Sequence, residues 1–160
     1  MKILLIVIYI IFLLFLQIGV LPHLAIFNSY PNLILLSILS LSIVRGWKKI
    51  LGWTIISGLF LDFYSLSNFL GISAVALLAV SYIVYSLSQN TFKKTTPLSL
   101  ALIFLITIFI YNLLVIAFYE IANISPGPRF PTFIFTIIYN WIVALPIFYL
   151  IKRYAQSRKI

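Results

Sequence analysis

The sequence contains no cysteine, one histidine and only two acidic residues, and these shortages exclude several kinds of site. Without cysteine the chain forms no disulfide and offers no thiolate to a metal ion. Charged residues occupy 8% of the positions, whereas about a quarter of a soluble domain is charged. With 64% hydrophobic residues, the chain has too little polar surface to cover itself in water. These figures indicate an integral membrane protein.

The hydrophobic residues fall into six runs separated by polar or turn-forming segments. They predict an all-α fold, a polytopic membrane protein with six transmembrane helices in a single domain, residues 1–160. The second run is short for a helix that crosses a bilayer, which needs about 20 residues. The predicted spans are 3–21, 31–44, 50–66, 69–88, 98–121 and 132–151.

The positive charges indicate how these spans are oriented. With both termini in the cytoplasm, every lysine and arginine except Arg129 lies on the inner side, as the positive-inside rule requires. The net charge of +9 is therefore a topological signal, and no nucleic-acid partner is predicted. The tail, residues 152–160, is predicted to bind anionic lipids of the inner leaflet. Its cations are Lys152, Arg153, Arg158 and Lys159.

The residues available for chemistry are few. Asp62 and Glu120 are the acids and His23 is the histidine. No phosphate-binding glycine–lysine motif, nucleophile elbow or metal-spaced cluster accompanies them. We therefore predict no enzymatic activity and no catalytic, cofactor-binding or metal-binding residues. Glu120 and His23 lie toward the outer ends of their spans and are expected to be interfacial.

Asp62 is the most informative residue, because a carboxylate within a span costs roughly 2.5–3.5 kcal/mol on insertion scales. Gly58, Asp62 and Ser65 recur at helical spacing and share one face, which another helix can approach closely. We favour an interhelical hydrogen bond near the outer membrane face, where water reaches the carboxylate. Ion coupling and partner docking are the alternatives.

Three other polar side chains lie within predicted spans, namely Gln17, Asn112 and Asn140. A side-chain amide inside a bilayer needs a hydrogen-bond partner. We therefore predict that all three are buried and bonded to neighbouring helices.

Four short motifs occur in order along the chain. Residues 17–18 are Gln-Ile, and residues 31–36 are Pro-Asn-Leu-Ile-Leu-Leu. Residues 58–71 contain the central pattern Gly-x3-Asp-x2-Ser followed by Leu-Gly, and residues 139–148 contain Tyr-Asn-Trp and Leu-Pro-Ile-Phe. In this combination, and over almost the whole chain, the sequence resembles the bacterial rod shape-determining protein MreD family.

The resemblance implies a non-enzymatic scaffold of the bacterial inner membrane that helps to maintain rod shape. It implies contact with the transmembrane helix of MreC, and membership of the elongation complex with MreB, RodA and a penicillin-binding transpeptidase. Through these partners the protein would help to position or regulate peptidoglycan synthesis. The implied fold is similar to that of the substrate-binding subunits of energy-coupling-factor transporters.

By matching position, Gly58, Asp62, Ser65 and Gly71 form the central motif of the family. We carry them over as helix-packing or partner-docking residues. Self-association as a homodimer through a small-residue face is a further expectation.

Two other functions are compatible with the residues. A substrate-binding subunit of a vitamin-type transporter needs several polar groups that converge under its outer loops. Asp62, Glu120, Arg129, Asn68 and Tyr30 are the candidates for such a pocket. An ion-coupled carrier would instead depend on Asp62 alone.

Overall fold

The computed structural model describes residues 9, 11–27, 29–64, 71–91, 96–121 and 130–156. Within these ranges the regular structure is helical, except for one antiparallel bridge between Ile26 and Ser29. The expected all-α class is confirmed, and six helices are present in the described part of the chain.

The N-terminal helix is described from Ile11 to Leu24. Its second half consists of a π-helical turn, η1, and a 3-10 turn, η2. The other helices have ordinary α geometry, and α4 continues as a π-helical turn, η3. In chain order the elements are η1 (Leu16–Val20), η2 (Leu21–Leu24), α2 (Leu33–Arg45), α3 (Trp47–Tyr64), α4 (Ile72–Ser86), η3 (Leu87–Thr91), α5 (Pro97–Ile121) and α6 (Phe130–Gln156).

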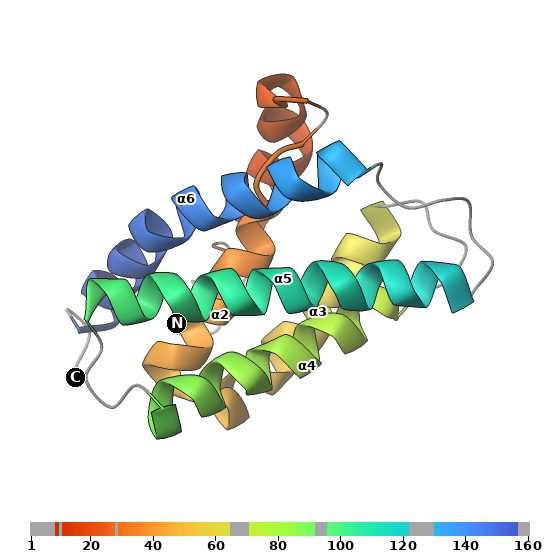
Figure 1. Ribbon diagram of the computed structural model, residues 1–160. Coiled ribbons are helices and arrows are strands. Elements are labelled where there is room, and N and C mark those ends of the chain that lie inside the picture. Colours follow the sequence, from red (N-terminus) through yellow and green to blue (C-terminus); the bar gives the residue numbers. More distant parts are fainter. Residues whose placement is uncertain are drawn as a thin grey trace.

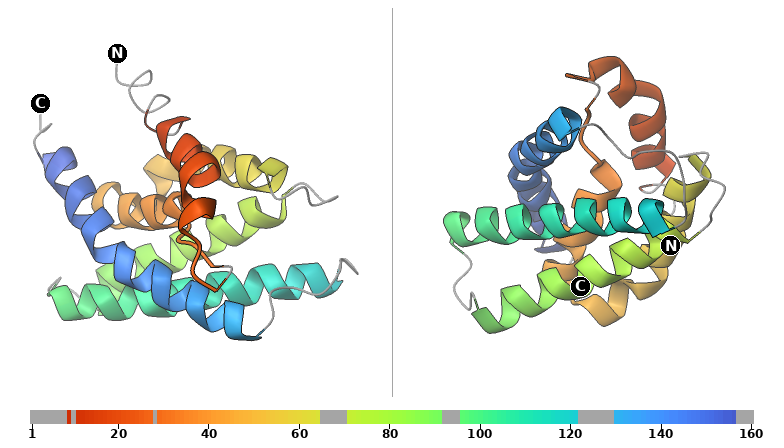
Figure 2. Two further views of the ribbon diagram at one scale, coloured as in Figure 1. Left: turned by 90° about the horizontal axis from the view of Figure 1, so that it is seen from above. Right: turned by 45° about the vertical axis from the view of Figure 1, so that its right-hand side comes forward.

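The long helices alternate in direction. α3 and α5 run one way along the bundle, and α2, α4 and α6 run the other way (Figure 1). The N-terminal helix lies at a steep angle to α5 (Figure 2). α2 packs against α3, α4 and α6 and therefore lies at the centre.

Within the described residues, three helical segments are long and apolar enough to cross a membrane, namely Ile72–Asn90, Pro97–Ile121 and Thr132–Ala155. The N-terminal helix and α2 are apolar but shorter. The 13 residues of α2 rise about 20 Å, whereas the hydrocarbon core of a bilayer is about 30 Å thick. An end of α2 therefore lies within the protein unless the bilayer thins around it.

The core forms around α2. Eight of the 13 residues of this helix are buried, and they include Leu35, Leu36 and Leu39. A mostly apolar helix lies either in a protein core or against lipid, and the burial of α2 shows that it lies in the core. On the far side of the core, Phe104 of α5 and Phe148 of α6 meet edge to face, with ring centroids 6.0 Å apart.

The closest helix pair is α3 and α4, which meet at Gly58. A Cβ atom at Gly58 would lie 2.7 Å from the backbone nitrogen of Ala74 and 2.8 Å from its Cβ, and it would overlap its Cα. The sequence predicted that small residues on this face admit another helix. That helix is α4 of the same chain, so Gly58 is a packing residue and is not open to a partner.

We predict that Gly58→Ala destabilises the protein, because the added methyl group meets backbone atoms that cannot rotate away. Overpacking of this kind costs about 1–3 kcal/mol. Gly52 on the same helix is the matched control, because it is exposed and has no neighbouring atom within 4 Å of a built Cβ. The midpoint of thermal unfolding in detergent, followed by circular dichroism, should fall for Gly58→Ala and stay near wild type for Gly52→Ala. Equal midpoints for the two variants would contradict this packing.

Candidate functional site

Asp62 accepts hydrogen bonds from the first backbone N–H groups of α4. The N–H of Gly71 donates to Oδ2 and the N–H of Ser73 donates to Oδ1, both at 2.8 Å. Gly71 is the N-cap of α4 and has no side chain that could serve this purpose. Its φ of +113° is in the left-handed region that favours glycine. Asp62 of α3 therefore acts as the cap of α4.

This arrangement suits a carboxylate in two ways. Unpaired N–H groups at a helix start need acceptors, and the helix dipole favours negative charge there. Asp62 is only 1% exposed, so water does not reach it as the sequence suggested. The buried Tyr111 of α5 lies near both Asp62 and the Ser73 side chain, which places a third helix against this junction. The interhelical hydrogen bonds expected for Asp62 are present, and the donors at the start of α4 are backbone N–H groups.

The start of α2 is capped in the same way, by side chains from two other helices. Gln17 of the N-terminal helix accepts from the N–H of Leu33 through Oε1 at 2.8 Å. Asn140 of α6 accepts from the N–H of Asn32 through Oδ1 at 2.7 Å. Asn32 itself accepts from the N–H of Leu35 at 2.9 Å. Gln17 and Asn140 are buried, as predicted, at 4% and 1% exposure.

The three consecutive residues of the Tyr-Asn-Trp motif contact three different elements. The Tyr139 hydroxyl donates to the Leu24 carbonyl at 3.5 Å, and Asn140 caps α2. The Trp141 indole N–H donates to the carbonyl of Ala101 on α5 at 2.8 Å. Successive residues of a helix point about 100° apart. One motif therefore links α6 to the N-terminal helix, to α2 and to α5.

Asn112 is less buried than the sequence predicted. Its side chain is half-buried, and its amide nitrogen donates to the carbonyl of Ile108, one turn earlier on α5, at 2.8 Å. Asn140 makes the same bond one turn back, to the carbonyl of Thr136, and in addition accepts from the N–H of Asn32. Asn112 is therefore less buried than expected, and its bond to a neighbouring helix stays a prediction.

The remaining predicted residues lie at helix ends or outside the described ranges. Lys152 is half-buried, with its ammonium group 5.9 Å from the centre of the Phe148 ring, and Arg153 is exposed. Glu120 and His23 are exposed, which agrees with interfacial positions. Ser65, Asn68, Arg129, Arg158 and Lys159 lie outside the described residues.

One cavity within the described ranges is too small for a typical ligand. A cavity of about 30 Å³ lies between the N-terminal helix, α2 and α3, and its lining is almost entirely apolar. Ligand pockets usually measure about 300–1,000 Å³ and contain several convergent polar groups. Among the described residues, no three metal-ligating side chains come together.

Sequence reasoning did not assign a capping role to Asn32 or to the backbone N–H groups of Gly71 and Ser73. Asn32 directly precedes a long apolar run, which is the usual signal of an N-cap residue. The donors at Gly71 and Ser73 have no signal of their own, because every non-proline residue carries a backbone N–H. Only the packing of α3 against α4 brings these donors to Asp62.

These contacts define a helical membrane protein whose buried polar side chains hold its own helices together. The family model described as rod shape-determining protein MreD matches residues 1–155, and the chain belongs to this family. MreD proteins are non-enzymatic proteins of the cytoplasmic membrane that act in rod-shape determination. No curated protein and no solved structure matches the chain.

We predict that Asp62→Asn destabilises the protein by about 1–3 kcal/mol, the usual cost of a lost hydrogen bond to a charged group. An amide has one oxygen, so its NH₂ group would face one of the two N–H donors of α4. Glu120→Gln is the matched control, because Glu120 is exposed at the end of α5. The midpoint of thermal unfolding in detergent measures the stability of both variants. The capping role is excluded if the two variants unfold at the same temperature.

Proposed function

We propose that the chain is a six-crossing scaffold of the cell-elongation machinery that binds the transmembrane helix of MreC. Its role would be to help to position or regulate peptidoglycan synthesis, in a complex that also contains MreB, RodA and a penicillin-binding transpeptidase. The observation that carries the proposal is the use of Asp62, Gln17 and Asn140 as internal helix caps. These side chains stabilise a platform and are not free to bind a substrate or an ion.

The distribution of charge supports a crossing with both termini in the cytoplasm. Arg45 ends α2, Lys48 and Lys49 lie in the first turn of α3, and Arg153 lies in the last turn of α6. These helix ends lie on the left in Figure 1. Glu120 lies at the opposite end, near the last residue of α5. Cations at one end and an acid at the other agree with the positive-inside rule.

For the partner contact we propose the half-buried face of α5 that carries Asn112. Its amide nitrogen donates to the Ile108 carbonyl of the same helix, and the side chain is half-buried. The side chain is flanked along α5 by Phe109 and Leu113, both 45% exposed. A polar side chain that faces lipid is unfavourable, and a hydrogen bond to a second helix reduces this free-energy cost. Such a bond would also add specificity to the contact.

We predict that Asn112→Leu weakens the complex with MreC several-fold while leaving the stability of the isolated protein unchanged. Interhelical hydrogen bonds in membranes contribute about 0.6 kcal/mol on average and up to about 2 kcal/mol. Asn140→Leu is the contrasting variant, because it removes the acceptor for the Asn32 N–H and should lower the unfolding temperature.

Co-purification after co-expression with the MreC of the same genome tests the proposed function. Tagged wild-type protein should retain MreC through size exclusion in mild detergent. If folded, monodisperse protein retains none, the scaffold proposal fails. If wild type retains MreC and Asn112→Leu retains as much, the proposed surface is wrong while the function stands.

A further inference from the structure

The chain between the N-terminal helix and α2 has its polar side chain inward and its apolar side chains outward. Ser29 is only 2% exposed, whereas the exposed fractions are 55% for Leu24, 54% for Ile26 and 68% for Phe27. A turn that faces water usually shows the opposite pattern, with small polar residues at its surface. We call Leu24–Phe27 together with Ser29 the outer turn.

Polar groups of the outer turn are bonded within the protein. Ile26 and Ser29 exchange backbone hydrogen bonds, because the N–H of each donates to the carbonyl of the other at 2.9 Å. The Ser29 hydroxyl donates to the Thr132 carbonyl at 3.0 Å and lies 3.2 Å from the Thr136 hydroxyl. Irregular backbone is rare inside a bilayer, since its polar groups usually have no partner there. At Ile26 and Ser29 these bonds supply the partners.

The contact with α6 shows how deep the outer turn lies. Phe27 stacks on Phe135, with ring centroids 4.3 Å apart, and the turn lies beside the first turns of α6 (Figure 2). Lys152, near the other end of α6, marks the inner edge of the hydrocarbon core. The helix rises about 26 Å from Phe135 to Lys152, whereas the core is about 30 Å thick. A tilt of α6 would reduce this height further. The outer turn therefore lies below the outer edge of the core.

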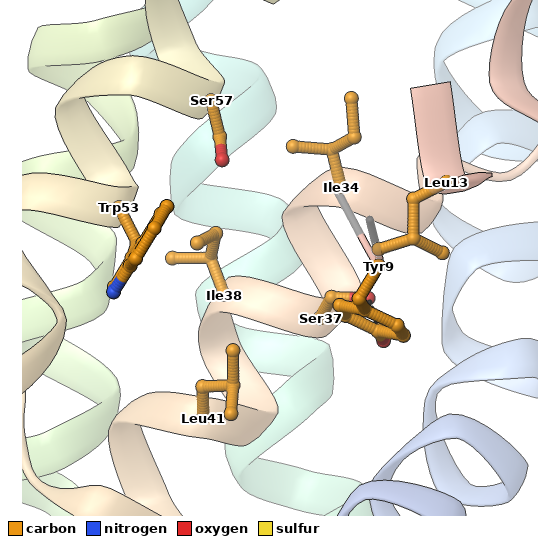
Figure 3. Close-up of a pocket in the computed structure, with 8 residues that line it drawn as sticks. All are labelled: Tyr9, Leu13, Ile34, Ser37, Ile38, Leu41, Trp53 and Ser57. Atoms are coloured by element: carbon orange, nitrogen blue, oxygen red, sulfur yellow. Dashed lines mark hydrogen bonds between the residues drawn. The ribbon is translucent and has the colours of Figure 1, made fainter. Parts of the chain in front are cut away.

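The N-terminal helix is attached to the bundle at both of its described ends. At its beginning, the Tyr9 hydroxyl and the Ser37 hydroxyl of α2 form a hydrogen bond of 3.1 Å (Figure 3). At its end, the Tyr139 hydroxyl of α6 donates to the Leu24 carbonyl at 3.5 Å. The outer turn follows directly and is held by α6, so it does not project away from the bundle into water.

Phe27 has a backbone conformation that a bulky side chain rarely adopts. Its φ of +51° is in the left-handed region, and among the described residues it is the one non-glycine residue with positive φ. Strain of this kind persists where the surrounding structure requires it. Here it closes the turn between Ile26 and Ser29 and places the Phe27 ring against Phe135, with most of its surface still exposed.

We propose that the outer turn is embedded in the membrane leaflet opposite Lys152, where Leu24, Ile26 and Phe27 contact the acyl chains of phospholipids. The apolar side chains point outward because lipid is their solvent, and Ser29 points inward because α6 supplies its polar partners. The contacts of the turn are with α6, whereas the face proposed for MreC is on α5. The embedding therefore does not depend on the proposed function.

The chain has no cysteine, so a single introduced cysteine reports on one position. Ile26→Cys and Phe27→Cys probe the outer turn. Glu120→Cys is the control for water, because the native carboxylate is exposed at the end of α5. Ile142→Cys is the control for lipid, because Ile142 is 61% exposed in the middle of α6. Each purified full-length variant is reconstituted at low density in phosphatidylcholine vesicles.

The first measurement is the rate of reaction with a water-soluble maleimide present on both sides of the bilayer. The cysteines of the outer turn should react about tenfold or more slowly than the one at Glu120, because the reactive thiolate is disfavoured without water. Their rates should be close to the rate at Ile142.

The second measurement identifies what covers the turn. Each cysteine is labelled with bimane in detergent, before reconstitution into vesicles that contain phosphatidylcholine with a nitroxide near the start of one acyl chain. Bimane at positions 26 and 27 should be quenched at least as strongly as bimane at position 142, and bimane at position 120 should be quenched less.

Two results would overturn the proposal. Reaction of Ile26→Cys and Phe27→Cys as fast as that of Glu120→Cys would show that the turn lies in water. Slow reaction without quenching by the nitroxide lipid would show that protein covers it, such as a second copy of the chain. If Phe27→Cys does not fold, Ile26→Cys decides the question, since only backbone groups of Ile26 form the hydrogen bonds described above.

Discussion

A helix that begins inside a protein embedded in a bilayer must find acceptors for its first backbone N–H groups, because no water is present to bond them. At the starts of α2 and α4, side chains of other helices supply these acceptors. Asp62 of α3 serves α4, while Gln17 of the N-terminal helix and Asn140 of α6 serve α2. The arrangement of the helices depends on these bonds, since each fixes both a helix end and its neighbour.

The same constraint connects the fold to the function. A chain with so few polar side chains uses the best-placed of them for capping, and little is left for catalysis or for a polar ligand pocket. The lack of a side chain at Gly58 also lets α3 pack directly against Ala74 of α4. A platform held in this way suits the family to which the chain belongs, whose members act in rod-shape determination without enzymatic activity. Its outward faces remain for lipids and for membrane partners.

The sequence predicted the helices well, because long apolar runs bounded by cations, prolines and glycines have few other solutions in a membrane. It also predicted that Asp62, Gln17 and Asn140 would be paired. It did not identify their partners, because pairing depends on which helix ends meet, and Asn32 and Asn140 are 108 residues apart. It overestimated the burial of Asn112, because composition does not tell which side of α5 faces a neighbour. Gly58 was assigned to the correct kind of contact, but the helix that it meets belongs to the same chain.

The most direct test of this account is the rate of backbone amide hydrogen exchange at the starts of α2 and α4 in the reconstituted protein. The first N–H groups of a helix normally exchange fast, since they have no acceptor within the helix. The caps predict that Leu33, Leu35, Gly71 and Ser73 exchange as slowly as residues in the middle of the same helices. Fast exchange at these four amides, beside protected helix centres, would show that the caps do not hold the helices together.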